Sequence, residues 1–123
     1  YGKPDSIMGS INIVHLVSGE QVITKLTELR DKDGEPFCFL FQMPMVLSLV
    51  PGETEEQTQI NYFPWSPFSG TKEFRVGFEK IVSIAEPLPN VFSTYVEINQ
   101  PVFPLLTPEE FEQFKKSKGA IKP

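Results

Sequence analysis

Short runs of apolar and β-branched residues, separated by turns, make up most of the chain. Residues 11–17 (INIVHLV) and 20–29 (EQVITKLTEL) are rich in Ile, Val and Thr, a composition that predicts strands. Residues 30–36 (RDKDGEP) contain the dipeptide Asp33-Gly34, which tolerates positive φ and favours a tight hairpin connection. We therefore expect the strands on either side of this turn to pair antiparallel.

The most regular alternation follows this turn. Apolar side chains occupy every odd position of the next stretch, namely Phe37, Phe39, Phe41, Met43, Met45, Leu47 and Leu49. A period of two predicts that they share one face of a strand. The stretch is longer than the ~5–6 residues of an average strand, and Pro44 cannot donate a hydrogen bond to a neighbouring strand. We predict two strands, or one sharply bent strand, hinged near residues 42–44.

The same patterns predict further strands at residues 58–63, 72–78 and 80–87, and residues 91–98 fit one more. Near the C-terminus, Thr107-Pro108-Glu109-Glu110 combines an N-cap, a proline at the first helical position and a capping-box glutamate. A helix from about residue 108 to 117 should follow. The pattern divides the chain into an irregular lead-in (1–10), one mainly β, antiparallel domain (11–98), and a C-terminal extension with a short helix (99–123).

Composition narrows the class of protein. A chain of 123 residues suits one domain, which buries about two-thirds of its unfolded surface. The net charge of −5 and the pI near 4.9 repel phosphate backbones, so any nucleic-acid binding must come from a local patch. No run approaches the roughly 20 apolar residues that cross a bilayer, so we expect no membrane partner.

Candidate catalytic and metal-ligating groups are few. His15 and Cys38, the only histidine and cysteine, are too few ligands for a zinc or iron site within the chain, so we expect no metal and no other cofactor. His15 is interpreted as a strand residue with a local hydrogen bond, and Cys38, flanked by two phenylalanines, as a buried thiol. We therefore expect that the protein is not an enzyme. A lone cysteine and the absence of a recognisable signal peptide predict a cytoplasmic protein.

Two further clusters leave alternatives open. The carboxylates at positions 31, 33 and 35 and at 53, 55 and 56 fit solvated loops, because neither set has the ligand pattern of a calcium loop. The aromatic and proline-rich residues 62–68 fit either a segment that caps the core or fills a subunit contact, or a platform that stacks unpaired bases. The first interpretation is favoured, because Lys32 is the only basic residue between Arg30 and Lys72.

Several segments, in order, resemble the two motifs of Sm-like (LSm) proteins over about residues 13–86: VSGEQVITKL, the DG turn, PFCFLF, MVLSLV and EFRVGFEKIVSI. In the first motif Met45 matches the family's methionine, while Gln42 and Val46 replace its Asp and Asn. In the second motif Val76-Gly77 replaces Arg-Gly, with Arg75 displaced by one residue. In its overall sequence character, without any single diagnostic motif, the chain also resembles small β proteins of marine cyanophages.

The resemblance implies a small, strongly bent, five-stranded antiparallel barrel whose subunits close into rings, commonly around RNA. The RNA-contacting positions that it implies are Gln42, Met43, Arg75 and Lys80. Two segments, residues 72–78 and 80–86, are the best candidates for open sheet edges, which pair readily with another subunit. The predicted subunit-interface residues on them are Phe74, Val76, Phe78, Ile81, Val82 and Ile84.

Three hypotheses of function follow, and for the third, a small enzyme, the sequence offers no catalytic constellation. The first is a non-enzymatic, homo-oligomeric Sm-like ring that binds single-stranded RNA or a protein partner. The second is a structural or assembly protein of a phage particle that acts through protein–protein contacts, which the acidity and the aromatic segment favour. A phage-encoded protein would lie in the host cytoplasm.

Overall fold

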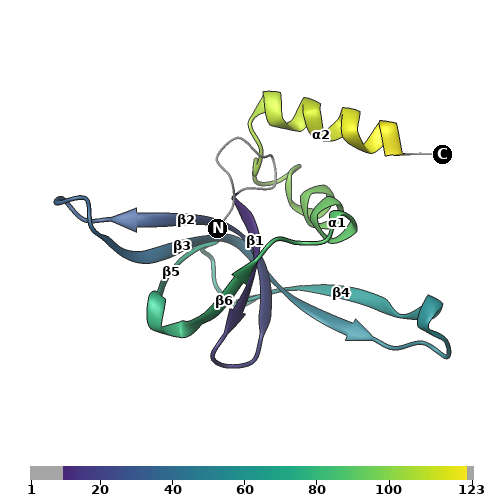
Figure 1. Ribbon diagram of the computed structural model, residues 1–123, viewed down its shortest axis with the longest axis horizontal. Coiled ribbons are helices and arrows are strands. Elements are labelled where there is room, and N and C mark those ends of the chain that lie inside the picture. The colour runs from purple at the N-terminus through teal and green to yellow at the C-terminus, as the bar shows by residue number, and fades with distance from the viewer. Residues whose placement is uncertain (1–9, 122–123) are drawn as a thin grey trace.

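A computed structural model of the protein describes residues 10–121 and contains one six-stranded sheet and two helices (Figure 1). The strands are β1 (Ile11–Leu16), β2 (Gln21–Arg30), β3 (Pro36–Val50), β4 (Gln59–Pro64), β5 (Glu73–Gly77) and β6 (Ile81–Ala85). The helices are α1 (Pro89–Asn99) and α2 (Pro108–Ile121), with short 3-10 turns η1 (Glu55–Gln57) and η2 (Phe78–Lys80). The mainly β prediction is confirmed. The predicted lead-in lies outside the described residues except for Ser10, and so do residues 122 and 123 of the predicted extension.

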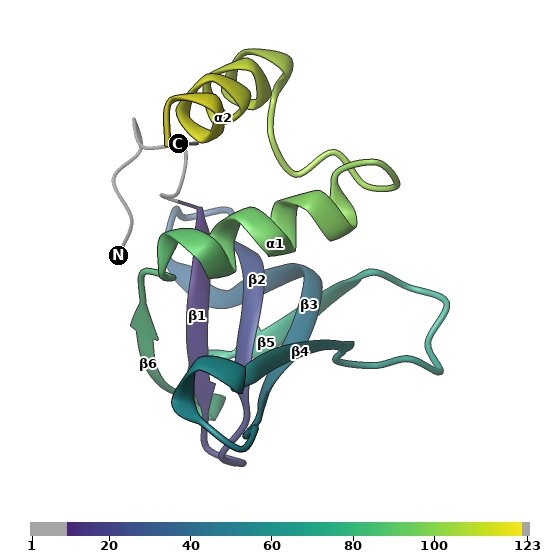
Figure 2. The ribbon, with the colours of Figure 1, turned by 90° about the vertical axis from the view of Figure 1, so that its right-hand side faces the viewer.

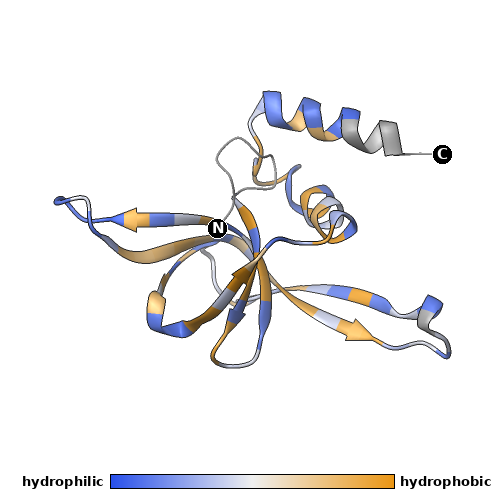
Figure 3. Cartoon of the chain, in the orientation of Figure 1, coloured by the Kyte–Doolittle hydropathy of each residue, from blue (hydrophilic) through white to orange (hydrophobic). Residues whose placement is uncertain are grey.

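The strands pair antiparallel in the order β4-β3-β2-β1-β6, with β5 beside the first half of β3. The predicted hairpin between β2 and β3 is confirmed. Gly34 has a φ of 83°, and the Asp31 carboxylate accepts hydrogen bonds from the backbone N–H groups of Asp33 and Glu35 at 2.9 and 3.0 Å. The hairpin tip is hydrophilic, whereas the strands are apolar where they cross the centre of the molecule (Figure 3).

The sheet bends but does not close, so the predicted five-stranded closed barrel is wrong in both strand number and closure. β4 pairs with residues 45–50 of β3, and β5 pairs with residues 38–42. Pro64 is the last residue of β4, and the segment that follows it, residues 65–72, contains Pro67 and separates the two pairings. β3 therefore has two different strands along one side.

The bend of β3 is a β-bulge at Met43, which confirms the hinge predicted at residues 42–44. Ile23 pairs with Met45, whereas Lys25 pairs with Gln42, so β3 carries one residue more than β2 over this interval. Met43 has a φ of 53°, in the left-handed region that residues other than glycine rarely adopt. The extra residue inverts the alternation of side chains. The prediction that all the odd positions share one face is therefore wrong.

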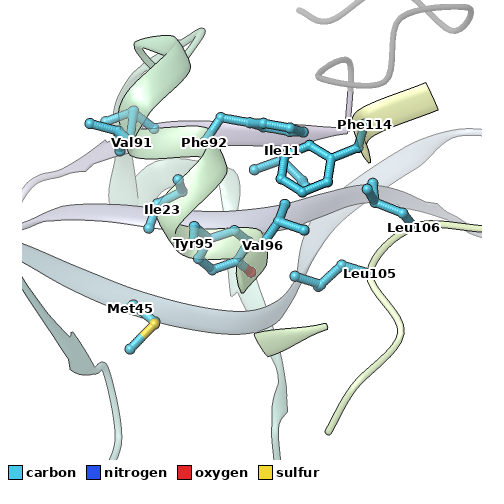
Figure 4. Packing of buried hydrophobic residues seen from close by; sticks show 11 residues of the cluster. Ile11, Ile23, Met45, Val91, Phe92, Tyr95, Val96, Leu105, Leu106 and Phe114 are labelled. Carbon is cyan, nitrogen blue, oxygen red and sulfur yellow. The ribbon is translucent and has the colours of Figure 1, made fainter. Parts of the chain in front are cut away.

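The two faces of the sheet build two cores. The helix-side core lies between the sheet and α1 (Figure 4) and contains Ile11, Ile13, Ile23, Met45, Val91, Phe92, Tyr95, Val96, Leu105, Leu106 and Phe114. The inner core lies on the other face and contains Val14, Leu16, Val22, Leu26, Phe39, Phe41 and Val76. Phe39 and Phe41 thus serve one core and Met45 the other, on either side of the bulge.

Residues 91–98, predicted as a strand, belong to helix α1, and that prediction is wrong. Pro89 begins the helix, and the buried Val91, Phe92, Tyr95 and Val96 have the spacing of one helical stripe. Burial of this stripe against the sheet overrides the strand propensity of the β-branched residues. The predicted C-terminal helix is confirmed as α2, whose capping box joins Thr107 and Glu110 by hydrogen bonds of 2.8 and 3.1 Å. α2 lies on the far side of α1 from the sheet (Figure 2).

Tyr95 fastens α1 to the bulge. Its hydroxyl lies 3.1 Å from the carbonyl oxygen of Gln42 and 2.9 Å from that of Met43. The hydroxyl of Thr24 also donates to the Gln42 carbonyl, at 2.9 Å. Burial raises the pKa of Tyr95 well above its usual range, although a backbone hydrogen bond from Lys25 opposes the shift. The helix thereby supplies a donor to the carbonyl groups of Gln42 and Met43 at the bulge.

We predict that Tyr95→Phe lowers the free energy of unfolding by about 1–2 kcal/mol, because it leaves buried carbonyl groups of the bulge without this donor. Urea denaturation measures the change. Tyr62→Phe is the matched control, since it removes a hydroxyl from the half-buried Tyr62 of β4, away from the bulge. Equal effects of the two variants would contradict this role of Tyr95.

The raised pKa of Tyr95 also predicts a loss of stability in alkali. The unfolded chain ionises its tyrosines near the ordinary value of 10.0, whereas the folded chain keeps Tyr95 neutral to higher pH. The contribution of Tyr95 is therefore complete below pH 10 and declines as the pH rises above it. Measured by urea denaturation at a series of pH values, the decline should be steeper for the wild type than for Tyr95→Phe. Identical slopes would contradict the prediction.

Candidate functional site: open sheet edges and an apolar groove

The structure brings together two of the four predicted RNA-contacting residues. Gln42 pairs with Glu73, and Leu40 pairs with Arg75, so Gln42 and Arg75 lie on one face of the β3–β5 pair. The Gln42 side-chain amide donates a hydrogen bond of 2.5 Å to the Glu73 carboxylate. A carboxylate next to Gln42 and Arg75 opposes the approach of phosphate groups.

The other two predicted RNA-contacting residues lie apart from this pair. Met43 is partly buried against the helix-side core. Lys80 is exposed in η2, beyond the end of β5 that lies away from Gln42, and its carbonyl accepts a 2.9 Å hydrogen bond from the backbone N–H of Val17. The four residues therefore do not form one patch.

Most of the predicted interface side chains face the chain's own inner core. Val76 is buried, and Phe74, Ile81 and Ile84 are partly buried against the same cluster. Val82 and Phe78 are exposed, by 67% and 38%. Among the described strands β6 pairs with β1 alone and β5 with β3 alone, so each has an open edge, as the sequence predicted for both segments. A contact along β6 would use the strand backbone and Val82.

β4, at the opposite end of the strand order from β6, is a further open edge, which sequence reasoning missed. It pairs with β3 alone among the described strands, and it carries Phe63, 51% exposed. The neighbouring Leu49 and Val50 of β3 are also exposed. The β-strand pattern of residues 59–64 was visible, but whether a strand lies at an edge depends on strand order, which local pattern does not contain.

An apolar groove of about 450 Å³ lies between the start of α1, the end of β6 and the hairpin of β3 and β4. Its walls include Ile13, Leu47, Ile60 and Val91. Leu49 and Leu88, 69% and 65% exposed, also line it. His15, Gln21, Ser48 and Glu86 supply polar atoms. The volume of the groove and its mainly apolar lining with a few polar groups are typical of the pockets in which proteins bind ligands.

His15 makes a local cross-strand contact beside this groove. It pairs with Ser83 of β6, and its Nδ1 lies 3.0 Å from the Ser83 hydroxyl oxygen. The interpretation of His15 as a strand residue with a local hydrogen bond is confirmed. Cys38 is buried, also as predicted.

The aromatic segment has two parts with different surroundings. The Trp65 ring packs against Phe41 and Phe74, with ring centroids 5.7 and 5.5 Å apart, and its indole N–H donates to the Glu20 carboxylate at 3.3 Å. Trp65 therefore caps the inner core, in line with the favoured interpretation. Phe68, three residues later, is 101% exposed.

Within residues 10–121 no helix is long and apolar enough to span a membrane. The same residues contain no group of three or more His, Cys, Asp or Glu side chains that could bind a metal ion.

Comparison with curated proteins gives no match. The model of one protein family matches residues 9–100, a span that contains all six strands and α1 and ends before α2. This match covers most of the sequence, and the chain therefore belongs to DUF6561, a family of unknown function.

Proposed function

We propose that this domain is a non-enzymatic assembly module, which forms homo-oligomers by pairing the open edge of β6 with the open edge of β4 in the next copy. One observation carries the proposal: the sheet ends on both sides in a strand that is paired on one side only within the described chain. Each of these strands exposes an apolar side chain, Val82 on β6 and Phe63 on β4. Unpaired backbone groups beside apolar side chains are a ready template for another strand.

The two edges are different surfaces, so the contact is head-to-tail. Such a contact closes into a ring if the rotation between copies permits, and otherwise continues as a filament. The bent sheet and the Sm-like resemblance together favour the ring.

Single-stranded RNA is the ligand that the resemblance implies for such a ring. Gln42 and Arg75, which share a face of β3 and β5, are the residues that support it. The adjacent Glu73 carboxylate and the net charge of −5 predict weak binding that moderate salt abolishes. A phage structural or assembly role would use the same subunit contacts with a protein partner in place of RNA.

Light scattering after size-exclusion chromatography tests the assembly. We expect the wild type to be an oligomer, with a mass of at least twice the 13.9 kDa of one chain. Val82→Lys and Phe63→Lys should each shift the protein towards monomer, because a charged side chain at a strand edge hinders pairing. Val102→Lys is the control, since Val102 is 78% exposed in the α1–α2 connection and lies on neither edge. A monomeric wild type, or equal dissociation by the control, would contradict the proposal.

The same assay distinguishes the partners. A short uridine-rich RNA added at low salt should shift the oligomer if RNA is a ligand, and Arg75→Glu should remove the shift. No shift at low salt would exclude this RNA and leave assembly with protein as the proposed role.

A further inference from the structure

Residue pairing across the sheet places the ends of its two outer strands at the same level. Two continuous rows of paired residues cross from β4 to β6: Pro64, Met45, Ile23, Ile13 and Ala85 in one, and Phe63, Val46, Val22, Val14 and Ile84 in the other. Four antiparallel pairings separate β4 from β6, so the two strands have the same sense along the path of the sheet, although its bend turns them to different directions in space (Figure 1). A second copy that adds its β4 beyond β6 in this sense, rotated to follow the bend, pairs the two strands in parallel. The copy that supplies β4 is the donor and the copy that supplies β6 is the acceptor, and Pro64 of the donor is level with Ala85 of the acceptor.

Charge favours this parallel register. The paired rows fix which residues of the two strands lie level. With the same offset, Lys80 of the acceptor copy lies level with Gln59 of the donor copy, next to the donor's acidic turn, which contains Glu53 and Glu56. At the other end Glu86 comes level with Trp65, on the side where Lys72 lies. Lys80 thus meets the acidic turn together with its neighbour Glu79, and the two charges offset each other, whereas a reversed pairing would bring Glu86 to the acidic turn with no cation beside it.

The turn that follows β4 presents one aromatic side chain on a hydrogen-bonded backbone. Phe68 is 101% exposed, although Pro67 and a set of hydrogen bonds restrain its turn. The Ser69 N–H donates to the Ser66 carbonyl at 3.2 Å, and the Thr71 N–H donates to the Ser69 hydroxyl at 3.1 Å. An exposed aromatic ring on a hydrogen-bonded turn requires less ordering of the backbone on binding, and aromatic rings are typical interface anchors.

The apolar groove lies at the end of β6 in the acceptor copy, where this register places the turn that carries Phe68. Ala85, Glu86 and Leu88 at the end of β6 line it, and in the parallel register this end meets the end of β4 and the turn that follows. In Figure 2 the connection between β4 and β5 projects on the right, while β6 and the start of α1 lie on the left. Donor and acceptor are therefore on opposite sides of one molecule, as a head-to-tail contact requires.

We infer that Phe68 of one copy inserts into the apolar groove beside β6 of the next copy and anchors the contact between them. The inference rests on the proposed edge pairing and adds to it the residue that fills the groove. The groove is then a binding site for a second copy of this chain.

Two variants that each remove one half of the contact test it by light scattering. Phe68→Ala removes the anchor, and Leu88→Asp places a charge in the groove at an exposed position, where Asp also suits the helix N-cap. Each alone should weaken self-association by about tenfold or more. Mixed in equal amounts, they should form a pair of twice 13.9 kDa and no larger species, because one intact Phe68 meets one intact groove. Val102→Ala is the control for loss of an exposed apolar side chain.

The outcomes separate this inference from the proposed function. If Phe68→Ala keeps the wild-type mass while Val82→Lys and Phe63→Lys dissociate, the anchor is wrong and the edge pairing stands. If Phe68→Ala and Leu88→Asp each dissociate but form no pair when mixed, the head-to-tail insertion is wrong. A monomeric wild type would overturn both proposals. Circular dichroism verifies that each variant is folded.

Discussion

The β-bulge at Met43 is the constraint on which the other features of this fold depend. One extra residue in β3 turns the odd-numbered side chains from the inner core to the helix-side core, so a single strand of 15 residues contributes to both. At the bulge, Tyr95 donates to the carbonyl groups of Gln42 and Met43, and Thr24 of β2 donates to that of Gln42. Because Tyr95 is on α1, the helix and the bend stabilise each other. Loss of either would expose part of the helix-side core.

The bend also decides where the molecule can bind others. After the bulge, β3 leaves the centre of the sheet with β4, and the hairpin of these two strands projects away from β6 (Figure 1). The groove lies between this hairpin, β6 and the start of α1. β4 and β6 remain open because the sheet bends without closing. Packing of the core thus produces the two edges and the groove that the proposed assembly uses.

Local sequence predicted the elements well and their arrangement poorly. The β-branched runs, the Asp33-Gly34 turn and the capping box at Thr107 act through neighbouring residues, so the strands, the hairpin and α2 could be read from the chain. The hinge was visible because Pro44 interrupts a long alternation. Residues 91–98 were misassigned because their β-branched content favours a strand, while the spacing of their buried side chains, which decides the outcome, matters only once a sheet face is present.

Candidate site residues show the same division between local and long-range information. Gln42 and Arg75 were predicted from motif positions, and the pairing of β3 with β5 brings them to one face together with Glu73, a neighbour that lies 31 positions from Gln42 in the chain. The open edge of β4 and the groove depend on strand order and on the bend, which no single segment encodes. Phe68 could be seen as one of several aromatics, but its complete exposure follows from the fold of the turn around Trp65.

The most direct test of assembly through the sheet edges is hydrogen exchange of the β4 and β6 amides over a range of protein concentrations. If copies pair edge to edge, the amides in residues 59–63 and 81–85 that face away from β3 and β1 should be protected at high concentration and exchange rapidly on dilution, while those of β1 and β2 stay protected throughout. Exchange of the two outer strands that is independent of concentration would contradict the account.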